Sequence, residues 1–200
     1  SVYTNAYPIL RELRVTATAF VSTAFLDSPD PFPFDRWGQD WGHVTPCEAY
    51  RPLTIEQCRN MQDDGTFSIG SHTHTHMDFR NQYQAFEADL RLSVDLIRSL
   101  FQESQVMFAY PYGRKHLGHV SDESMELARE VGVACALTTE ARPVDLVTDP
   151  IGWPRFNVYQ WDTAETLGAK LAGWYSWAPR LQECFVRPHK GAPEKVQSKV

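Results

Sequence analysis

Three histidines alternate with threonines in the stretch SHTHTH, residues 71–76. In a helical turn, His72 and His76 lie four residues apart and point the same way, whereas in an extended chain His74 would share their face. Imidazole nitrogen binds zinc, nickel, cobalt or iron, and two histidines leave room for a carboxylate and a water. We therefore predict a metal site with His72 and His76 as ligands. A polar loop with surface histidines is the alternative.

An open metal site of this kind is suited to hydrolysis. The ion lowers the pKa of a bound water and polarises the carbonyl group of a substrate. The motif YPYG at 110–113 offers a second element of the same chemistry. Pro111 and Gly113 predict a tight turn, which can aim the backbone N–H of Tyr112 at a developing oxyanion. A turn without a chemical role is the alternative for this motif.

Hydrophobic patterning predicts the elements that carry these motifs. Strands are expected at 15–22, 66–71, 106–110 and 133–139, with a short strand or extended segment at 153–158. Helices are expected at 3–13, 53–65, 81–101, 122–132 and 162–178. Thr54 and Gln57 form a capping box for the second of these helices, and Asp162 or Thr163 caps the last. Residues 26–52, rich in Pro, Gly, Asp and Trp, are expected to form a long loop.

Helices and strands alternate along the chain, which indicates a parallel sheet with helical crossovers, either open and doubly wound or closed as a barrel. Sites in such folds form at the carboxyl ends of the strands. SHTHTH, YPYG and the loop that contains Trp41 each follow a predicted strand. We therefore expect histidines, acids and aromatic rings to meet at one edge of the sheet. Loop tryptophans often line grooves that bind sugars, although packing explains any single one of them equally well.

Composition narrows the class of protein. The chain has 200 residues, 42% hydrophobic and 22% charged, which suits one soluble globular domain. The net charge of −6 and the lack of a basic patch argue against a nucleic-acid partner. No signal peptide and no membrane-length apolar run is visible, so the location stays open between the cytoplasm and the cell envelope. The four cysteines form no CxxC pair, which favours free thiols over a cysteine zinc site, although a Cys47–Cys58 disulfide is conceivable.

These motifs together resemble those of the polysaccharide deacetylases, the NodB-like carbohydrate esterase family. The family motif Ser-His-(Ser/Thr)-x-x-His matches SHTHTH, with His72 and His76 in the two ligand positions. A further motif, Arg-Pro-(Phe/Tyr)-Gly, matches YPYG, and FAYPYG is a variant found in the poly-N-acetylglucosamine type. WPRFNV resembles a later segment of that subgroup and carries Arg155. The resemblance runs from about residue 3 to about residue 160.

The resemblance implies a deformed (β/α)7 barrel and a divalent metal, most simply zinc, held by two histidines and an aspartate. It implies that metal-activated water hydrolyses the N-acetyl groups of a polysaccharide or oligosaccharide, with an aspartate as base and a histidine as acid. The implied site residues are His72 and His76 for the metal, Tyr112 and Arg155 for catalysis, and Tyr110, Pro111, Gly113 and Trp41 for the substrate.

The family's Asp-Asp motif and first barrel strand have no match here, so we expect them upstream of Ser1. Loss of a central strand would leave unpaired edges, which makes a truncated chain a simpler explanation than a degenerate one. Asp40 could stand in for the missing acid. The histidine that protonates the leaving amine has three candidates, His116, His119 and His189. We assign residues 1–187 to an incomplete catalytic domain and 188–200 to a disordered tail.

Three functions remain on these grounds. The first is a metal-dependent polysaccharide deacetylase. The second is an inactive or truncated relative that binds carbohydrate without turnover. The third is a hydrolase of acetyl esters or of other amides. The tryptophan-rich loop favours a sugar polymer modestly.

Overall fold

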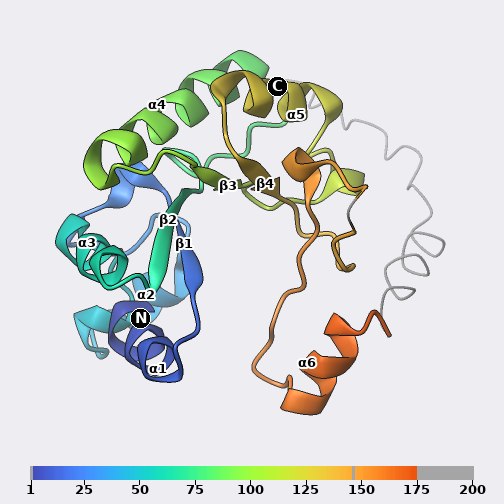
Figure 1. Cartoon of the computed structure of the whole chain (residues 1–200). Helices are drawn as coiled ribbons and strands as arrows, with labels where there is room; N and C mark the ends of the chain where they lie inside the picture. Colours follow the sequence, from blue (N-terminus) through green and yellow to red (C-terminus); the bar gives the residue numbers. More distant parts are fainter. Residues whose placement is uncertain (1, 146, 175–200) are drawn as a thin grey trace, which may run out of the picture. The chain divides into compact units, whose positions relative to one another are not determined.

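The computed structural model describes residues 2–145 and 147–174 of the chain (Figure 1). The described residues group into two units. The first holds residues up to 140 together with 144–155, and it contains SHTHTH, YPYG and Arg155. The second holds residues 141–143 and the chain from 156 onward.

The first unit is built on a parallel sheet with strand order β1-β2-β3-β4. The strands are β1 (Ala17–Val21), β2 (Phe67–Ser71), β3 (Met107–Ala109) and β4 (Cys135–Leu137). Val21 pairs with Ser71, Ser71 pairs with Phe108, and Phe108 pairs with Ala136. A parallel bridge from Leu137 to Trp153 adds an extended segment beside β4. The carboxyl ends of the strands therefore lie in one row.

Helices connect the strands and lie outside them (Figure 1). They are α1 (Tyr7–Leu13), α2 (Arg36–Trp41), α3 (Ile55–Asp63), α4 (Tyr83–Phe101) and α5 (Asp122–Val131). The long helix α4 buries one stripe of residues at helical spacing, Phe86, Leu90, Val94 and Ile97, against β2 and β3. Each such side chain contributes about 1.5–3 kcal/mol when it is fully buried. The core formed in this way fixes α4 against the sheet.

Helix ends match the local chemistry of the sequence. Thr54 and Gln57 form the predicted capping box at the start of α3, and Gly132 closes α5 in the left-handed conformation. The expected loop at 26–52 contains α2, which the sequence analysis did not predict. Asp35 caps this six-residue helix by accepting a hydrogen bond from the Gly38 N–H at 3.1 Å. A helix this short, with glycine in it, shows no periodicity in the sequence.

The second unit contains α6 (Ala164–Leu171), which Thr163 caps together with Thr166. Lys170 pairs with Asp162 at 2.5 Å and fixes the start of this helix. The predicted helix extended to 178, and its last residues, the domain boundary at 187 and the tail at 188–200 lie outside the described residues.

The described cysteines, Cys47, Cys58 and Cys135, are free thiols, as expected, while Cys184 lies outside the described residues. None of the helices within residues 2–145 and 147–174 combines the length and the apolar character that a membrane span requires.

Gly70, in the middle of β2, leaves no room for a side chain. A Cβ at this position would lie 2.7 Å from the Phe20 ring and 2.9 Å from the backbone oxygen of Met107. We expect Gly70→Ala to lower the free energy of unfolding by about 1–3 kcal/mol, because the backbone oxygen cannot yield without disturbing the sheet. Urea denaturation measures this change.

Gly168→Ala in α6 is the matched control. Nothing lies within 4 Å of the added methyl group there, so alanine should hold or raise stability. Equal stabilities of the Gly70→Ala protein and the parent would show that the close approach does not constrain β2.

Candidate active site

His72 and His76 meet just beyond the end of β2. Their ring centroids lie 4.7 Å apart, with the ring planes at 74°. The segment between them is neither helix nor strand, because Thr73 and His76 both adopt positive φ, 66° and 57°. The segment is therefore an irregular turn. It is neither the helical turn nor the extended chain that the sequence suggested. This turn nevertheless brings together the two histidines predicted to share an ion.

His72 has a fixed tautomer. Its Nδ1 lies 2.6 Å from the backbone oxygen of Ala109, and since a carbonyl only accepts, Nδ1 carries the proton. The lone pair is then on Nε2, which is the nitrogen left for a metal. Burial, with smaller contributions from the charges of His76 and Arg155, lowers the pKa of His72 to about 4. The ring is therefore neutral at physiological pH, as a metal ligand must be.

His76 lies between aromatic rings and is only partly solvated. It stacks on Phe34 at 4.1 Å between centroids and meets the edge of Tyr112 at 5.4 Å. Burial lowers its pKa. Its Nδ1 is buried without a hydrogen-bond partner in the protein. A buried nitrogen of this kind suits an added ligand, since leaving it unpaired costs about 1–3 kcal/mol.

Thr73 holds the turn from inside. Its side chain is fully buried, its hydroxyl donates to the His72 backbone oxygen at 2.6 Å, and it accepts from the His76 N–H at 3.0 Å. One hydroxyl therefore ties the two histidines to each other.

His74 points away from the other two histidines. Its Nδ1 lies 2.8 Å from the hydroxyl of Thr23, and its backbone oxygen accepts from the Ala24 N–H at 3.0 Å. His74 thus joins the turn to the residues after β1, and only His72 and His76 form a pair.

Tyr112 occupies a strained turn after β3. Its φ is 62°, and the Gly113 N–H donates to the Pro111 oxygen at 2.7 Å, which closes a three-residue γ-turn. The hydroxyl of Thr139, in the chain after β4, donates to the Tyr112 oxygen at 2.8 Å and holds this turn. Within the described residues, the Tyr112 N–H donates to no protein acceptor. It is therefore available to a ligand, and strained backbone of this type is common at functional sites.

Three of the predicted substrate contacts, Tyr110, Pro111 and Gly113, are buried in this structure, and their contact with a substrate stays a prediction. Tyr110 is 1% exposed and its hydroxyl donates to the Ile151 oxygen at 3.1 Å. Pro111 and Gly113 are also buried, and a Cβ on Gly113 would lie 2.9 Å from the Thr139 nitrogen. Tyr110 and Pro111 nevertheless line the small pocket beside Tyr112. Their role is to build the turn that presents Tyr112.

Arg155 follows the extended segment that pairs with β4, so it reaches the same edge of the sheet. Its backbone N–H donates to the Glu140 oxygen at 3.2 Å. Burial lowers the pKa of its guanidinium, and its Nε is buried without a partner. A desolvated cation with an unused donor is suited to an anionic ligand or intermediate.

A cavity of about 450 Å³ opens beside the histidine pair. It is lined by both histidines and by apolar groups from the loop after β1, among them Phe32, Phe34 and Leu53. Trp41 is 54% exposed and is not among the lining residues. The sequence predicted an aromatic contribution from Trp41 and gave no signal for Phe34 beyond its place in the Pro- and Asp-rich stretch.

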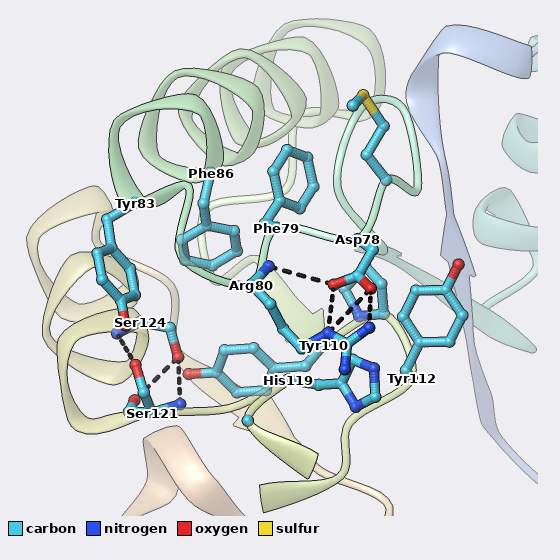
Figure 2. Close-up of a pocket in the computed structure, with 13 residues that line it drawn as sticks. Asp78, Phe79, Arg80, Tyr83, Phe86, Tyr110, Tyr112, His119, Ser121 and Ser124 are labelled. Carbon is cyan, nitrogen blue, oxygen red and sulfur yellow. Dashed lines mark hydrogen bonds and ion pairs between the residues drawn. The ribbon is translucent and has the colours of Figure 1, made fainter. Parts of the chain in front are cut away.

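Tyr112 also lines a smaller pocket, of about 20 Å³, which is shown in Figure 2. Arg80 forms an ion pair with Asp78 at 2.5 Å in its wall, and the ring of His119 lies 5.0 Å from the Tyr112 ring. His119 Nδ1 is buried without a partner. A pocket of this size admits a water molecule but no sugar. Of the three candidate acids, His119 is thus in contact with a predicted site residue, and His189 lies outside the described residues.

The two histidines fit two corners of a zinc site. The hydrogen bond at Nδ1 of His72 leaves its Nε2 lone pair free for an ion, and His76 has a buried nitrogen without a partner. Among residues 2–145 and 147–174, no third His, Cys, Asp or Glu completes a group of three. Asp40 is exposed on α2 and does not supply the missing acid. The donor set present is therefore partial.

A family model described as polysaccharide deacetylase matches residues 1–136. The poly-beta-1,6-N-acetyl-D-glucosamine N-deacetylase of Staphylococcus aureus (strain N315) is 22% identical over 153 residues, covering 72% of this chain and 46% of the relative. The enzyme of the same name from Staphylococcus epidermidis is 23% identical over 176 residues, covering 84% and 53%. The chain spans about half the length of the curated relatives it matches.

Solved structures show the same fold. The Streptococcus pyogenes deacetylase PplD in complex with acetate matches with a TM-score of 0.66 at 20% identity, covering 85% of this chain and 65% of that one. IcaB from Ammonifex degensii matches with a TM-score of 0.63 at 19% identity, covering 86% and 68%. The predicted NodB-like fold class is confirmed, and the four-stranded parallel sheet is consistent with part of such a barrel.

The structure predicts a measurable role for the Thr73 hydroxyl. Thr73→Val keeps the shape and the branched Cβ but leaves the buried His76 N–H without its acceptor. We expect the free energy of unfolding to fall by about 1–3 kcal/mol, as measured by urea denaturation. The exposed Thr16 provides the control, because Thr16→Val should change stability by less than about 0.5 kcal/mol. A Thr73→Val protein as stable as this control would rule out the hydroxyl as the support of the turn.

Proposed function

The chain belongs to the polysaccharide deacetylase family, and we propose that it contributes a metal-dependent site that hydrolyses N-acetyl groups on a carbohydrate polymer. The observation that carries the proposal is the His72–His76 pair, with centroids 4.7 Å apart at the carboxyl edge of the sheet. The tautomer of His72 and the unpartnered nitrogen of His76 support a shared ion, for which zinc is the simplest choice.

A divalent ion held there supplies the charge that activates water and polarises the acetyl carbonyl. The chain's own groups have separate parts in the reaction. The free N–H of Tyr112 donates to the oxygen that becomes negative in the tetrahedral intermediate. The buried charge of Arg155 favours negative charge beside His72. Because the γ-turn fixes the Tyr112 N–H in advance, no reorganisation is needed as this charge develops.

His119 is the proposed acid for the leaving amine. It contacts the Tyr112 ring, and the same ring contacts His76. The rings of His119, Tyr112 and His76 therefore form a row at one edge of the sheet. Burial and the nearby charge of Arg80 lower the pKa of His119, so the ring can act as an acid only after it takes up a proton during the reaction. The pocket that contains the His119 ring is too small for a sugar. The leaving amine would therefore take the proton from His119 at the opening of this pocket.

The substrate class comes from relatives and from the cavity. The staphylococcal relatives are named for deacetylation of poly-beta-1,6-N-acetyl-D-glucosamine, and a polymer of N-acetylated sugars is the class we propose here. Apolar and aromatic walls such as those of Phe32 and Phe34 suit the flat faces of sugar rings. Trp41, exposed on α2, stays a candidate for contact with sugars farther along the polymer.

A second candidate function is carbohydrate binding without turnover. The observation that favours it is the lack of a third ligand among the described residues. Zinc titration separates the two, because two histidines bind the ion weakly and a complete His-His-Asp site binds it tightly. Hydrolysis of acetyl esters or of other amides is a variant of the first function and is distinguished by the substrate assayed.

Removing either histidine should abolish metal-dependent deacetylation in the full-length protein. We expect His72→Ala and His76→Ala each to reduce acetate release from an N-acetylglucosamine oligomer to the level without enzyme, since each removes a ligand. His74→Ala is the control and should retain most of the activity, because His74 faces Thr23. Activity that survives His72→Ala or His76→Ala would refute the assignment.

His119→Phe tests the proposed acid. Phenylalanine keeps a ring against Tyr112 but carries no proton, so kcat should fall about 100-fold or more while zinc affinity stays unchanged. Exposed His116 serves as the control, and His116→Phe should have the kinetics of the parent. Unchanged kcat in the His119→Phe protein would exclude His119 as the acid without affecting the metal assignment.

A further inference from the structure

One carboxylate from α4 supports the histidine turn. The half-buried Asp89 accepts from the His74 N–H at 2.5 Å and from the Thr75 N–H at 3.2 Å. It also accepts from the Thr75 hydroxyl at 2.5 Å. These donors lie between the two paired histidines in the sequence. A single side chain therefore holds the middle of the turn through three donors, two of them backbone N–H groups.

The turn needs such support because its backbone is strained. Thr73 and His76 both have positive φ, a conformation that residues with a Cβ adopt only under constraint. Thr73 is also branched at Cβ, which makes its conformation less favourable still. Without outside contacts, the segment would relax toward extended or helical conformations. Either change would rotate His72 and His76 relative to each other.

The scaffold behind Asp89 is rigid. Asp89 follows Phe86 and precedes Leu90 on α4, and both of those side chains are packed in the core. One turn further along the helix, Ser93 lies 2.9 Å from the hydroxyl of Ser71, the last residue of β2. Helix α4 thus contacts the chain at the end of the strand and again in the middle of the turn. The position of the turn is fixed by the packing of a 19-residue helix.

We propose that Asp89 is the positioning residue for the His72–His76 pair. By holding residues 74 and 75, its carboxylate sets the spacing at which the two imidazoles face each other and hence their joint affinity for a divalent cation. The part of this proposal that concerns the cation rests on the proposed function, and the part that concerns the turn does not. Asp89 itself is no ligand, since its oxygens are taken up by the turn.

Asp89→Asn is the test, with Asp95→Asn as the matched control. Both residues are acids on α4, but Asp95 is exposed and forms only a surface ion pair with Arg98, at 3.7 Å. Asparagine keeps the size of the side chain, while its NH2 group opposes the donors of the turn. Asp89→Glu provides a second variant, which restores the charge and should rescue part of the effect. Far-ultraviolet circular dichroism confirms folding before each measurement.

Three readouts are compared in the full-length protein. Amide hydrogen exchange at His74 and Thr75, followed by NMR, should be at least about 10-fold faster in the Asp89→Asn protein. The Kd for Zn²⁺ alone should rise by about 10–100-fold, as expected for loss of a group that orients metal ligands. In deacetylation, kcat should fall with little change in KM, because the substrate-lining residues are untouched. The Asp95→Asn protein should match the parent in all three.

The outcomes separate this proposal from the proposed function. Unchanged amide exchange and unchanged nuclear Overhauser contacts between the His72 and His76 rings in the Asp89→Asn protein would overturn the positioning role. Faster exchange with altered ring contacts supports the role even if the parent neither binds zinc nor deacetylates, in which case only the proposed function fails. Faster exchange with zinc affinity equal to that of a zinc-binding parent would overturn the link between the turn and the metal.

Discussion

Parallel pairing places the ends of four short strands in one row, and the histidine turn and the Tyr112 turn both begin directly at that row. His72 continues the pairing by donating its N–H to the Val21 oxygen at 2.9 Å, and Tyr110 does so by donating to the Leu137 oxygen at 3.1 Å. The irregular backbone begins immediately afterwards. The hydrogen bonds between the strands therefore determine the residue at which each turn starts. If β2 shifted by one residue against its neighbours, His72 would face the opposite side of the sheet.

The ladder alone does not determine the shape of the turns, because strained residues follow it at once. Thr73, His76 and Tyr112 all have positive φ. They are held by the hydroxyl of Thr73 within the histidine turn, by Asp89 from α4, and by Thr139 from the chain after β4. Strain of this kind costs about 1–3 kcal/mol for each residue. The strain persists because the surrounding core, formed largely by α4, is packed too tightly to rearrange around a relaxed turn.

The sequence predicted the strands and the histidine pair because those features are local. Alternating and β-branched residues mark β1 and β2, and the capping box of Thr54 marks the start of α3 within a few residues. The spacing of His72 and His76 limited them to geometries in which they share a side. Helix α2 could not be predicted, since its stability rests on the Asp35 cap and on close packing around Gly38. Neither leaves a periodic pattern.

The burial of Tyr110, Pro111 and Gly113 could not be predicted from the sequence, for a different reason. A motif shows which residues occur together but not which of them face solvent. Here the turn reverses direction at Tyr112, so one residue emerges while its neighbours are enclosed by Thr139 and Ile151. The contact of Asp89 with the histidine turn could not be predicted either, because a contact between positions 74 and 89 depends on how α4 packs against β2.

Unpaired polar atoms identify the site independently of the family. Within the part of the chain that the structure describes, three buried side-chain atoms have no hydrogen-bond partner: His76 Nδ1, His119 Nδ1 and Arg155 Nε. Each costs about 1–3 kcal/mol of desolvation that nothing in the protein offsets. All three belong to residues at the carboxyl edge of the sheet, and the rest of the core leaves none. Chance would scatter such atoms, whereas a binding site gathers them, because a ligand supplies the missing partners. The grouping of these atoms therefore supports the candidate site independently of the histidine pair, on which the proposal of a bound cation rests.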